Sequence, residues 1–254
     1  MINIALCGGY GKMGRTISEM CEGSDRFNVS YVIETPEKCI LTDLGIGLRL
    51  NDVIDHDDID VVVDFTSKRS SIDHLKISIE NNKPFLTGTT GFDEKDMAEI
   101  KAVSEKGKVF YSPNFSLGIF ILGKMLKCVS EHIRDDYDIE LLEMHHNQKA
   151  DAPSGTALKL RDILLSNNPD YEVIYGRKGI YEPRKRDEIA IHTLRGGDVV
   201  GDHKIIFAGN GERLELSHKA SSRKTFGSGV LRAIDFLLEQ KQNGLYLMED
   251  LFKI

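Results

Sequence analysis

The chain has 254 residues, a length that allows one large domain or two of moderate size. Its formal net charge of −7 argues against nucleic acid as the main partner, although a local basic cleft could still bind an acidic small molecule. No apolar run reaches the length of a transmembrane helix, and the short apolar N-terminus lacks the features of a signal peptide. We therefore expect a cytoplasmic protein that has no membrane partner.

The cysteines of the chain do not form a recognisable disulfide or metal motif. They stand at Cys7, Cys21, Cys39 and Cys128, without C-x-x-C spacing and without the density of a disulfide scaffold. The histidines and carboxylates also lack the spacing of a zinc site. We expect reduced thiols and no metal.

The N-terminus combines a strand, a glycine loop and a helix. Residues 2–7 are a short apolar run that predicts a buried parallel strand, and the G-x-x-G-x-x-G pattern at residues 8–14 opens a helix directly after it. Such a loop brings backbone N–H groups to a pyrophosphate at a helix N-terminus. The candidate cofactor-binding residues are Gly8, Gly9, Tyr10, Gly11, Lys12 and Met13.

A second predicted strand, residues 29–33, ends at Glu34. This carboxylate lies about 20 residues after the loop, where dinucleotide-binding proteins hold the adenosine ribose hydroxyls. No arginine follows it to receive a 2′-phosphate, which favours NADH. Lys12, Arg15 and Lys38 could still supply positive charge for NADPH, so both cofactors stay open.

Strands and helices continue to alternate up to residue 115. Apolar strands are predicted at residues 60–65, 85–87 and 109–111, with helices at 71–82 and 93–103 between them. This order predicts an α/β fold with a doubly wound, Rossmann-type parallel sheet.

The remainder predicts a second domain of α+β type. We expect a helix at residues 117–132, a strand at 137–144, a helix after residue 156, a loop at 167–186, and strands at 188–194, 199–208 and 213–218. The glycine-rich turns at 195–198 and 209–211 have hairpin composition, so the sheet should be mixed and largely antiparallel. A last helix, residues 225–240, should return to the first domain. The predicted domains are residues 1–115 with 225–254, which bind the dinucleotide, and residues 116–224, which bind substrate and self-associate.

Polar residues with acid–base chemistry gather after the strand at 137–144. His145, His146 and Lys149 precede Ser154-Gly155-Thr156 at the start of a helix. The helix start predicts an anion site, and the imidazoles and the ammonium could donate a proton near neutral pH. Histidines in such a pair are often only surface or core residues, and neighbours on a strand point to opposite faces, so the two should not share one role.

The run E-x-x-E-x-H-H-x-x-K-x-D-A-P-S-G-T-A, residues 140–157, resembles the signature of the 4-hydroxy-tetrahydrodipicolinate reductase (dihydrodipicolinate reductase) family. The resemblance implies NAD(P)H-dependent reduction of 4-hydroxy-tetrahydrodipicolinate in lysine and diaminopimelate biosynthesis. It implies that His145 and Lys149 are the candidate acids. It also implies that His146, Ser154, Gly155 and Thr156 hold a carboxylate of a small dicarboxylate substrate.

Other segments extend the resemblance along the chain. G-T-T-G-F at residues 88–92 and S-P-N-F-S at 112–116 are either tight turns or, as the resemblance implies, contacts of the nicotinamide. The cofactor-binding candidates there are Gly88, Thr89, Thr90, Ser112, Pro113, Asn114 and Phe115. The resemblance also implies a homotetramer formed through the second-domain sheet. Arg195 and Lys219 are either ligands of the second carboxylate or surface charges. Another Rossmann oxidoreductase of small acids and a nucleotide-sensing regulator remain the alternatives.

Overall fold

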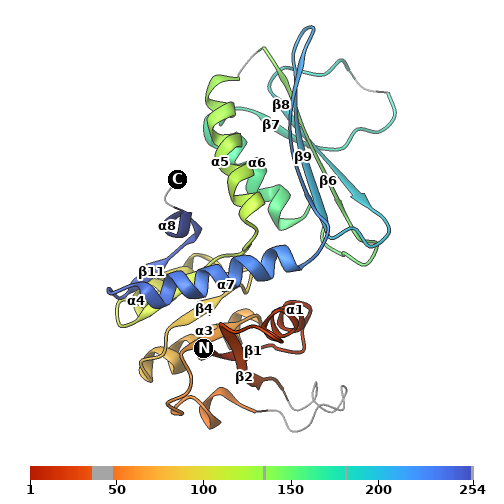
Figure 1. The fold of residues 1–254 in the computed structure, drawn as a ribbon. Coiled ribbons are helices and arrows are strands. Elements are labelled where there is room, and N and C mark those ends of the chain that lie inside the picture. Colours follow the sequence, from red (N-terminus) through yellow and green to blue (C-terminus); the bar gives the residue numbers. More distant parts are fainter. Residues whose placement is uncertain (36–47, 134–135, 181, 253–254) are drawn as a thin grey trace. The chain divides into compact units, whose positions relative to one another are not determined.

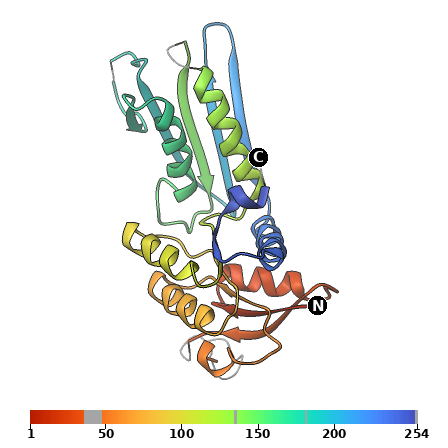
Figure 2. The same ribbon diagram turned by 90° about the vertical axis from the view of Figure 1, so that its left-hand side faces the viewer.

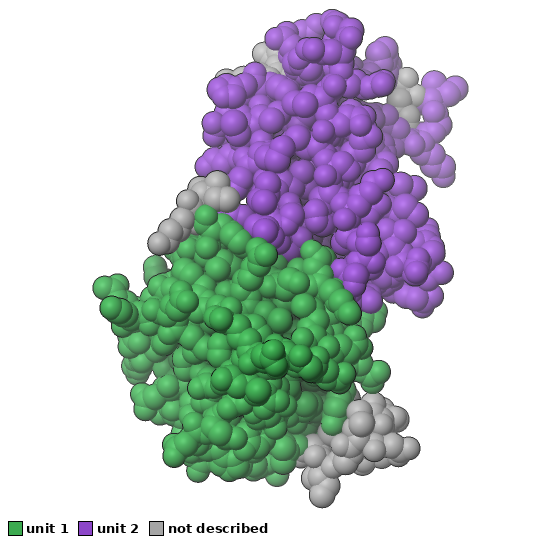
Figure 3. Space-filling model, viewed as in Figure 1, with its two compact units in different colours: residues 1–115, 224–254 green, residues 116–223 purple. Residues whose placement is uncertain are grey.

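The computed structural model describes residues 1–35, 48–133, 136–180 and 182–252. The chain divides into two compact units, Met1–Phe115 with Lys224–Ile254, and Ser116–Arg223 (Figure 3). Cys39 and Lys38, which the sequence analysis names, lie outside the described residues. Among the helices of the described residues, none has the length and apolar character that crossing a membrane requires.

The first unit contains a six-stranded parallel sheet in the order β11-β5-β4-β3-β1-β2 (Figure 1). Its strands are β1 (Ile2–Cys7), β2 (Phe27–Ile33), β3 (Val61–Asp64), β4 (Phe85–Thr87), β5 (Lys108–Tyr111) and β11 (Gly244–Tyr246). Strands covered on both faces are apolar along their whole length, which is why the Val-Val-Val run of β3 forms a central strand. The predicted Rossmann-type sheet is confirmed. The three-residue β11 is too short for a sequence pattern to indicate.

Helices pack in pairs on this sheet. They are α1 (Lys12–Cys21), α3 (Lys68–Glu80), α4 (Glu94–Ser104), α7 (Lys224–Glu239) and α8 (Met248–Phe252), with a short 3₁₀ turn at Leu50–Asp52. Helix α1 lies beside α7, and α3 lies beside α4 (Figure 2). Side chains fix where two of them begin, because Ser67 caps α3 and Asp93 caps α4. A Cβ at Gly229 would lie 1.8 Å from the Phe115 carbonyl oxygen, so α7 packs against the first unit as expected.

The second unit contains a five-stranded mixed sheet in the order β10-β9-β6-β8-β7. Its strands are β6 (Asp138–His145), β7 (Glu172–Tyr175), β8 (Glu188–Arg195), β9 (Gly201–Ala208) and β10 (Arg213–Ala220). Strand β9 is antiparallel to both β6 and β10, whereas β8 is parallel to both β6 and β7. The predicted mixed sheet is therefore confirmed, but the expectation that it is largely antiparallel is wrong, because two of its four strand pairings are parallel.

Two further details of the second-unit prediction are wrong. The turn at residues 195–198 does not close a hairpin, because β6 lies between β8 and β9 and pairs with both. Residues 167–186 are not all loop, because β7 forms within them at the edge of the sheet. The strand is short, its end residues Glu172 and Tyr175 are exposed and Val173 and Ile174 are half-buried, so it carries no alternating pattern of apolar residues. The hairpin at Gly209–Gly211 does join β9 to β10.

Helices α5 (Leu117–His132) and α6 (Gly155–Asn167) lie on one side of this sheet (Figure 1). Side chains from both helices and from the strands form the core of the unit. Burial alternates along β6, so that Ile139, Leu141, Glu143 and His145 all lie on the buried face. The last two of these are polar, and they begin the candidate site.

Candidate functional site

Glu143 is the centre of the site in the second unit, and its side chain is fully buried on β6. Oε1 accepts hydrogen bonds from the Ser154 backbone N–H at 3.1 Å and from Arg195 Nη2 at 3.0 Å. Oε2 accepts from Arg195 Nη1 at 3.0 Å and from His145 Nδ1 at 2.5 Å. Burial raises the pKa of Glu143, but the hydrogen bonds and charges of His145 and Arg195 outweigh it and lower the pKa to about 2. Glu143 is therefore an ionised carboxylate.

His145 takes a fixed orientation from this carboxylate. An ionised carboxylate accepts hydrogen bonds only, so the shared proton lies on Nδ1 of His145. The histidine is 8% exposed, and a Cβ at Gly201 would lie 3.0 Å from its Nε2. The glycine thus leaves room beside Nε2, the ring nitrogen from which His145 can exchange a proton.

Arg195 is an ion-pair partner of Glu143 and not an exposed surface charge. Its guanidinium pairs with both oxygens of Glu143 and also donates to the carbonyl oxygens of Lys149 and Asp151. The arginine, at the end of β8, therefore ties the loop after β6 to the buried carboxylate. Lys219, the other candidate ligand of the second carboxylate, is exposed on β10.

Ser154 connects the carboxylate to helix α6. Its hydroxyl caps the helix by accepting from the Ala157 N–H at 3.2 Å, while its own N–H donates to Glu143. Gly155 follows it, is exposed, and has nothing within 4 Å of a Cβ placed on it. Thr156 is half-buried. The helix thus begins at open space, where its first N–H groups can bind an anion.

Lys149 lies in the loop between β6 and α6, where Nζ makes an ion pair with Asp151 at 2.8 Å. Its side chain is 22% exposed, and its backbone N–H donates to the carbonyl of the half-buried His146. Burial raises the pKa of Asp151, whereas the hydrogen bond from Lys149 lowers it below its usual value. The structure brings His145 and Ser154 together around Glu143, with Lys149 joined to them through Arg195.

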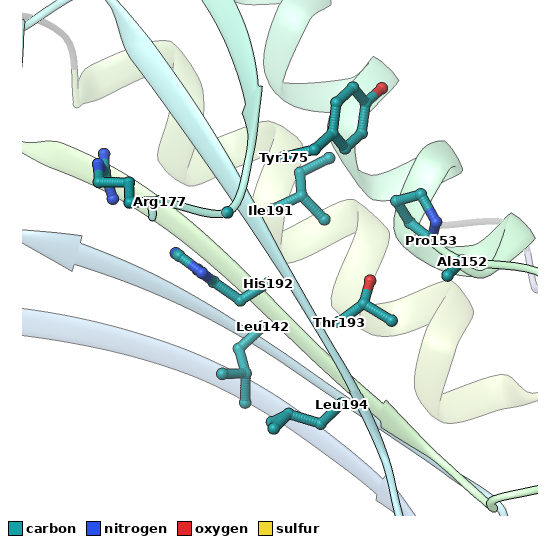
Figure 4. Close-up of a pocket in the computed structure, with 10 residues that line it drawn as sticks. Leu142, Ala152, Pro153, Tyr175, Arg177, Ile191, His192, Thr193 and Leu194 are labelled. Atoms are coloured by element: carbon teal, nitrogen blue, oxygen red, sulfur yellow. The ribbon is translucent and has the colours of Figure 1, made fainter. Parts of the chain in front are cut away.

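Glu140, the first glutamate of the same signature, belongs to a separate ion cluster. It pairs with Arg177 at 3.0 Å, with Arg184 at 3.2 Å and with His192 at 2.7 Å. A cavity of about 770 Å³ lies beside this cluster, along β8 beyond the end of β7. Figure 4 shows Arg177 and His192 on one side of it and Pro153 on the other. This cavity does not include His145 or Lys149.

The glycine loop of the first unit has the close approaches that a phosphate-binding turn needs. Gly8 has φ +79°, and a Cβ on it would lie 2.5 Å from the Phe65 carbonyl oxygen. A Cβ at Gly14 would lie 2.4 Å from the Gly8 oxygen. Helix α1 begins at Lys12 with Gly11 as its N-cap and with no side chain capping it. Because no side chain caps this helix, the N–H groups of its first turn can bind a phosphate. The residues present therefore fit a dinucleotide.

Glu34 follows β2 and lies against this loop. Its carboxylate is 6% exposed and accepts from the Tyr10 N–H at 3.4 Å. It also lines a cavity of about 620 Å³. Arg49 and His74 line the same cavity, and neither is among the residues that the sequence indicates. Only the fold brings Arg49 to the cavity that Glu34 lines.

Asp64, at the end of β3, anchors the loops around that cavity. It is fully buried and accepts from the hydroxyls of Thr66 and Thr89 and from His74 Nδ1. Cys7 lies nearby, and its sulfur and the ligand atoms of Asp64 and His74 are within 4.8 Å of one another. Burial, and then the charges of Asp64 and Glu34, raise the pKa of Cys7 well above its usual value. The raised pKa keeps Cys7 a protonated thiol, and the carboxylate of Asp64 already accepts hydrogen bonds from protein donors. Such residues make a poor set of metal ligands.

The two predicted nicotinamide-side loops lie after neighbouring strands, β4 and β5. Thr89, Ser112 and Phe115 are buried and support the loops from inside, for example through the Ser112 hydroxyl, which donates to the Asn114 carbonyl at 2.7 Å. Gly88 and Asn114 are half-buried, and Thr90 and Pro113 are exposed. The carboxyl ends of parallel strands are where such folds bind their ligands.

The pKa of Glu143 predicts a specific dependence of stability on pH. Because this pKa is lowered from 4.5 to about 2, the carboxylate stabilises the folded state above pH 4.5, and this contribution is lost as the pH falls toward 2. A shift of this size corresponds to at most about 3 kcal/mol of unfolding free energy. In thermal unfolding scans between pH 6 and pH 2, the Tm gap between the wild type and Glu143→Gln should narrow with decreasing pH. A gap that stays constant would contradict the assigned pKa.

Comparisons with known proteins agree along the whole chain. A family model described as dihydrodipicolinate reductase, N-terminus, matches residues 2–115, and a second, described as its C-terminus, matches residues 118–252. A 4-hydroxy-tetrahydrodipicolinate reductase of Methanococcus aeolicus is 40% identical over 272 residues, covering 100% of this chain and 99% of the relative. The protein of the same name from Methanocaldococcus jannaschii is 41% identical and covers 97% of this chain and 95% of its own length.

A solved structure agrees with these sequence matches. Dipicolinate-bound dihydrodipicolinate reductase from Paenisporosarcina sp. TG-14 aligns with a TM-score of 0.80 at 25% identity, covering 99% of each chain. The resemblance seen in residues 140–157 is thereby confirmed by matches that extend over both units. The chain belongs to the 4-hydroxy-tetrahydrodipicolinate reductase family.

Proposed function

We propose that this chain catalyses the reaction of its family, the reduction of 4-hydroxy-tetrahydrodipicolinate to tetrahydrodipicolinate with loss of water, in lysine and diaminopimelate biosynthesis. The observation that carries the proposal is the pairing of an oriented imidazole with an open helix N-terminus in the second unit. A dicarboxylate needs an anion site, and its reduction needs a proton donor. Both lie within the network around Glu143.

The cofactor is a nicotinamide dinucleotide, which supplies a hydride when bound. We assign its binding to residues 1–115 and 225–254. The glycine loop holds the pyrophosphate through backbone N–H groups, and Glu34 accepts from the ribose hydroxyls. The loops at residues 88–90 and 112–115 border the nicotinamide end, with their buried members keeping them in place.

We assign substrate binding to residues 116–224. His146, Ser154, Gly155 and Thr156 bind one carboxylate at the start of α6, where N–H groups and hydroxyls provide several donors. The relative that is solved with dipicolinate supports a small planar dicarboxylate as the ligand. Lys149 attracts the same anion, in competition with its present partner Asp151.

The proton comes from the end of β6 or from the loop that follows it. His145 is the first candidate, because Glu143 holds its Nδ1 proton and stabilises the imidazolium, which leaves Nε2 to give a proton to the reduced substrate. Lys149 is the second candidate, and a dianionic substrate favours the charged form of both groups. Once the proton has left, the neutral imidazole remains hydrogen-bonded to Glu143.

Substitution of His145 tests the acid role. His145→Gln should lower kcat by roughly 100-fold or more, with a much smaller change in the substrate KM, because general acid catalysis contributes about 10²–10⁴. Lys149→Gln should be compared in the same assay of NADH oxidation, and Gln148→Ala, exposed in the same loop, is the matched control. Unchanged kcat in His145→Gln would remove the histidine from the acid role. Absence of turnover in the wild type would reject the proposed reaction itself.

We further propose that the chain uses NADH and also accepts NADPH. Glu34 favours NADH, since a carboxylate binds ribose hydroxyls and repels a 2′-phosphate. Arg49 lines the same cavity as Glu34 and is an exposed residue. Its guanidinium is suited to bind a phosphate. Arg49 thus provides the arginine that is missing from the residues directly after Glu34.

Arg49→Gln tests this assignment. Loss of one charge-assisted hydrogen bond to a phosphate should lower kcat/KM for NADPH by about 10-fold and leave the value for NADH within about 2-fold. The control is Arg69→Gln, an exposed arginine on α3 that does not line the cavity. Equal losses with the two cofactors would show that Arg49 does not discriminate between them.

The second-unit sheet is also the surface through which we propose self-association into a homotetramer. Helices α5 and α6 lie on one side of the sheet, and the β6 side chains of alternate residues such as Leu142 point to the other. Leu194 on β8, which pairs with Met144 of β6 on that other side, is 44% exposed. Beyond Tyr175 the edge of β8 lacks a strand partner among the described residues. An exposed apolar sheet face with a free edge is typical of a protein–protein contact.

A further inference from the structure

His203 is a buried polar residue that the proposed mechanism leaves without a role. It lies on β9 directly opposite Glu143 of β6 and opposite His218 of β10, on the face that α6 covers. The residue is 3% exposed. Its neighbours further along β9 on this face, Ile205 and Phe207, are apolar core residues. A histidine in such a position requires a reason beyond packing.

Two contacts connect His203 to the site. Nε2 lies 3.2 Å from the Ser154 hydroxyl, and the ring packs edge-on against His145 with centroids 5.2 Å apart. Nδ1 is buried and has no hydrogen-bond partner among the described residues. His203 therefore contacts both the capping serine of α6 and the candidate acid. It is itself buried and does not face open space.

The Ser154 hydroxyl has two partners at once. It accepts from the Ala157 N–H at 3.2 Å and bonds His203 Nε2 at the same distance, so it joins the first turn of α6 to the histidine. His203 makes this bond as a neutral imidazole. Burial, and then the charge of His145, lower the pKa of His203 to about 4, in agreement with this neutral form.

We propose that His203 is a positioning residue of the substrate site, which fixes the Ser154 hydroxyl and with it the first turn of α6. It touches no reacting atom. As a neutral ring it also packs against His145 without adding a second positive charge beside it. This inference rests on the proposed function, because Ser154 matters only if the start of α6 binds the substrate carboxylate.

Two neutral polar replacements separate positioning from simple burial. The amide of Gln reaches the place of Nε2 and keeps a hydrogen-bond partner for Ser154, whereas the shorter amide of Asn reaches only the place of Nδ1. His203→Asn should raise the KM for 4-hydroxy-tetrahydrodipicolinate roughly 3- to 10-fold, which is the range for one hydrogen bond. His203→Gln should restore most of the wild-type KM. The KM for NADH should stay within about 2-fold in both.

A double-mutant cycle with Ser154→Ala tests the route of the effect. If His203 acts through the Ser154 hydroxyl, His203→Asn should add little to the substrate KM of the Ser154→Ala variant. The matched control is His218→Asn, also a histidine of this face on the adjacent strand, but one whose Nε2 contacts Ser116 instead. It should leave the substrate KM within about 2-fold.

The outcomes are distinct. Equal KM values for His203→Asn and His203→Gln, additive effects in the cycle, or the same loss in His218→Asn would each overturn the proposal. A wild type without turnover of this substrate would instead reject the proposed function. Far-ultraviolet circular dichroism and Tm identify a variant that has not folded. If His203→Asn does not fold, Ser154→Ala alone decides: it should raise the KM for 4-hydroxy-tetrahydrodipicolinate, and a wild-type KM in this variant would overturn the proposal.

Discussion

The buried carboxylate of Glu143 is the interaction on which the site of the second unit depends. A charge in the interior is costly unless it is fully paired, and here the N–H of Ser154, the guanidinium of Arg195 and the imidazole of His145 together satisfy both oxygens. These donors come from the start of α6, the end of β8 and the end of β6. One side chain thus connects the proposed acid, the proposed anion site and the loop between them. Removing its charge would leave the half-buried Arg195 without its ion-pair partner.

A buried carboxylate also lies at the carboxyl edge of the sheet in the first unit. Asp64 is fully buried at the end of β3 and holds Thr66, Thr89 and His74, which belong to two loops and to α3. In both units a buried carboxylate at or near the end of a strand holds neighbouring segments together through hydrogen bonds. Such anchoring fits the proposed reaction, because hydride and proton donors must be held in orientation.

Much of this architecture could be predicted from the sequence, because it follows from local patterns. The glycine loop after β1, the apolar run of β3 and the His145–Thr156 segment each carry their signal within a few residues. Pairing between distant segments carries no such signal. The position of β6 between β8 and β9 was missed for this reason, since the turn at residues 195–198 has the composition of a hairpin.

The same limit applies to the residues of the site. Arg195 has the sequence context of a surface arginine, and only the β6–β8 register brings it onto Glu143. The fold of the first unit places Arg49 at the same cavity as Glu34, and the β6–β9 pairing brings His203 to Ser154. A buried histidine in an apolar strand, with Ile205 and Phe207 at alternate positions, is the one signal that could have indicated His203.

The central claim is that the charge of Glu143 organises the substrate site, and the kinetics of Glu143→Gln test it most directly. This substitution keeps the shape of the side chain and removes the charge. With 4-hydroxy-tetrahydrodipicolinate generated enzymatically in the assay and NADH as cofactor, we predict that kcat/KM for the substrate falls by about 100-fold or more, as for loss of an oriented acid. Binding of NADH, measured by titration of the same folded variant, should be unchanged. A variant with wild-type kcat/KM would contradict the account.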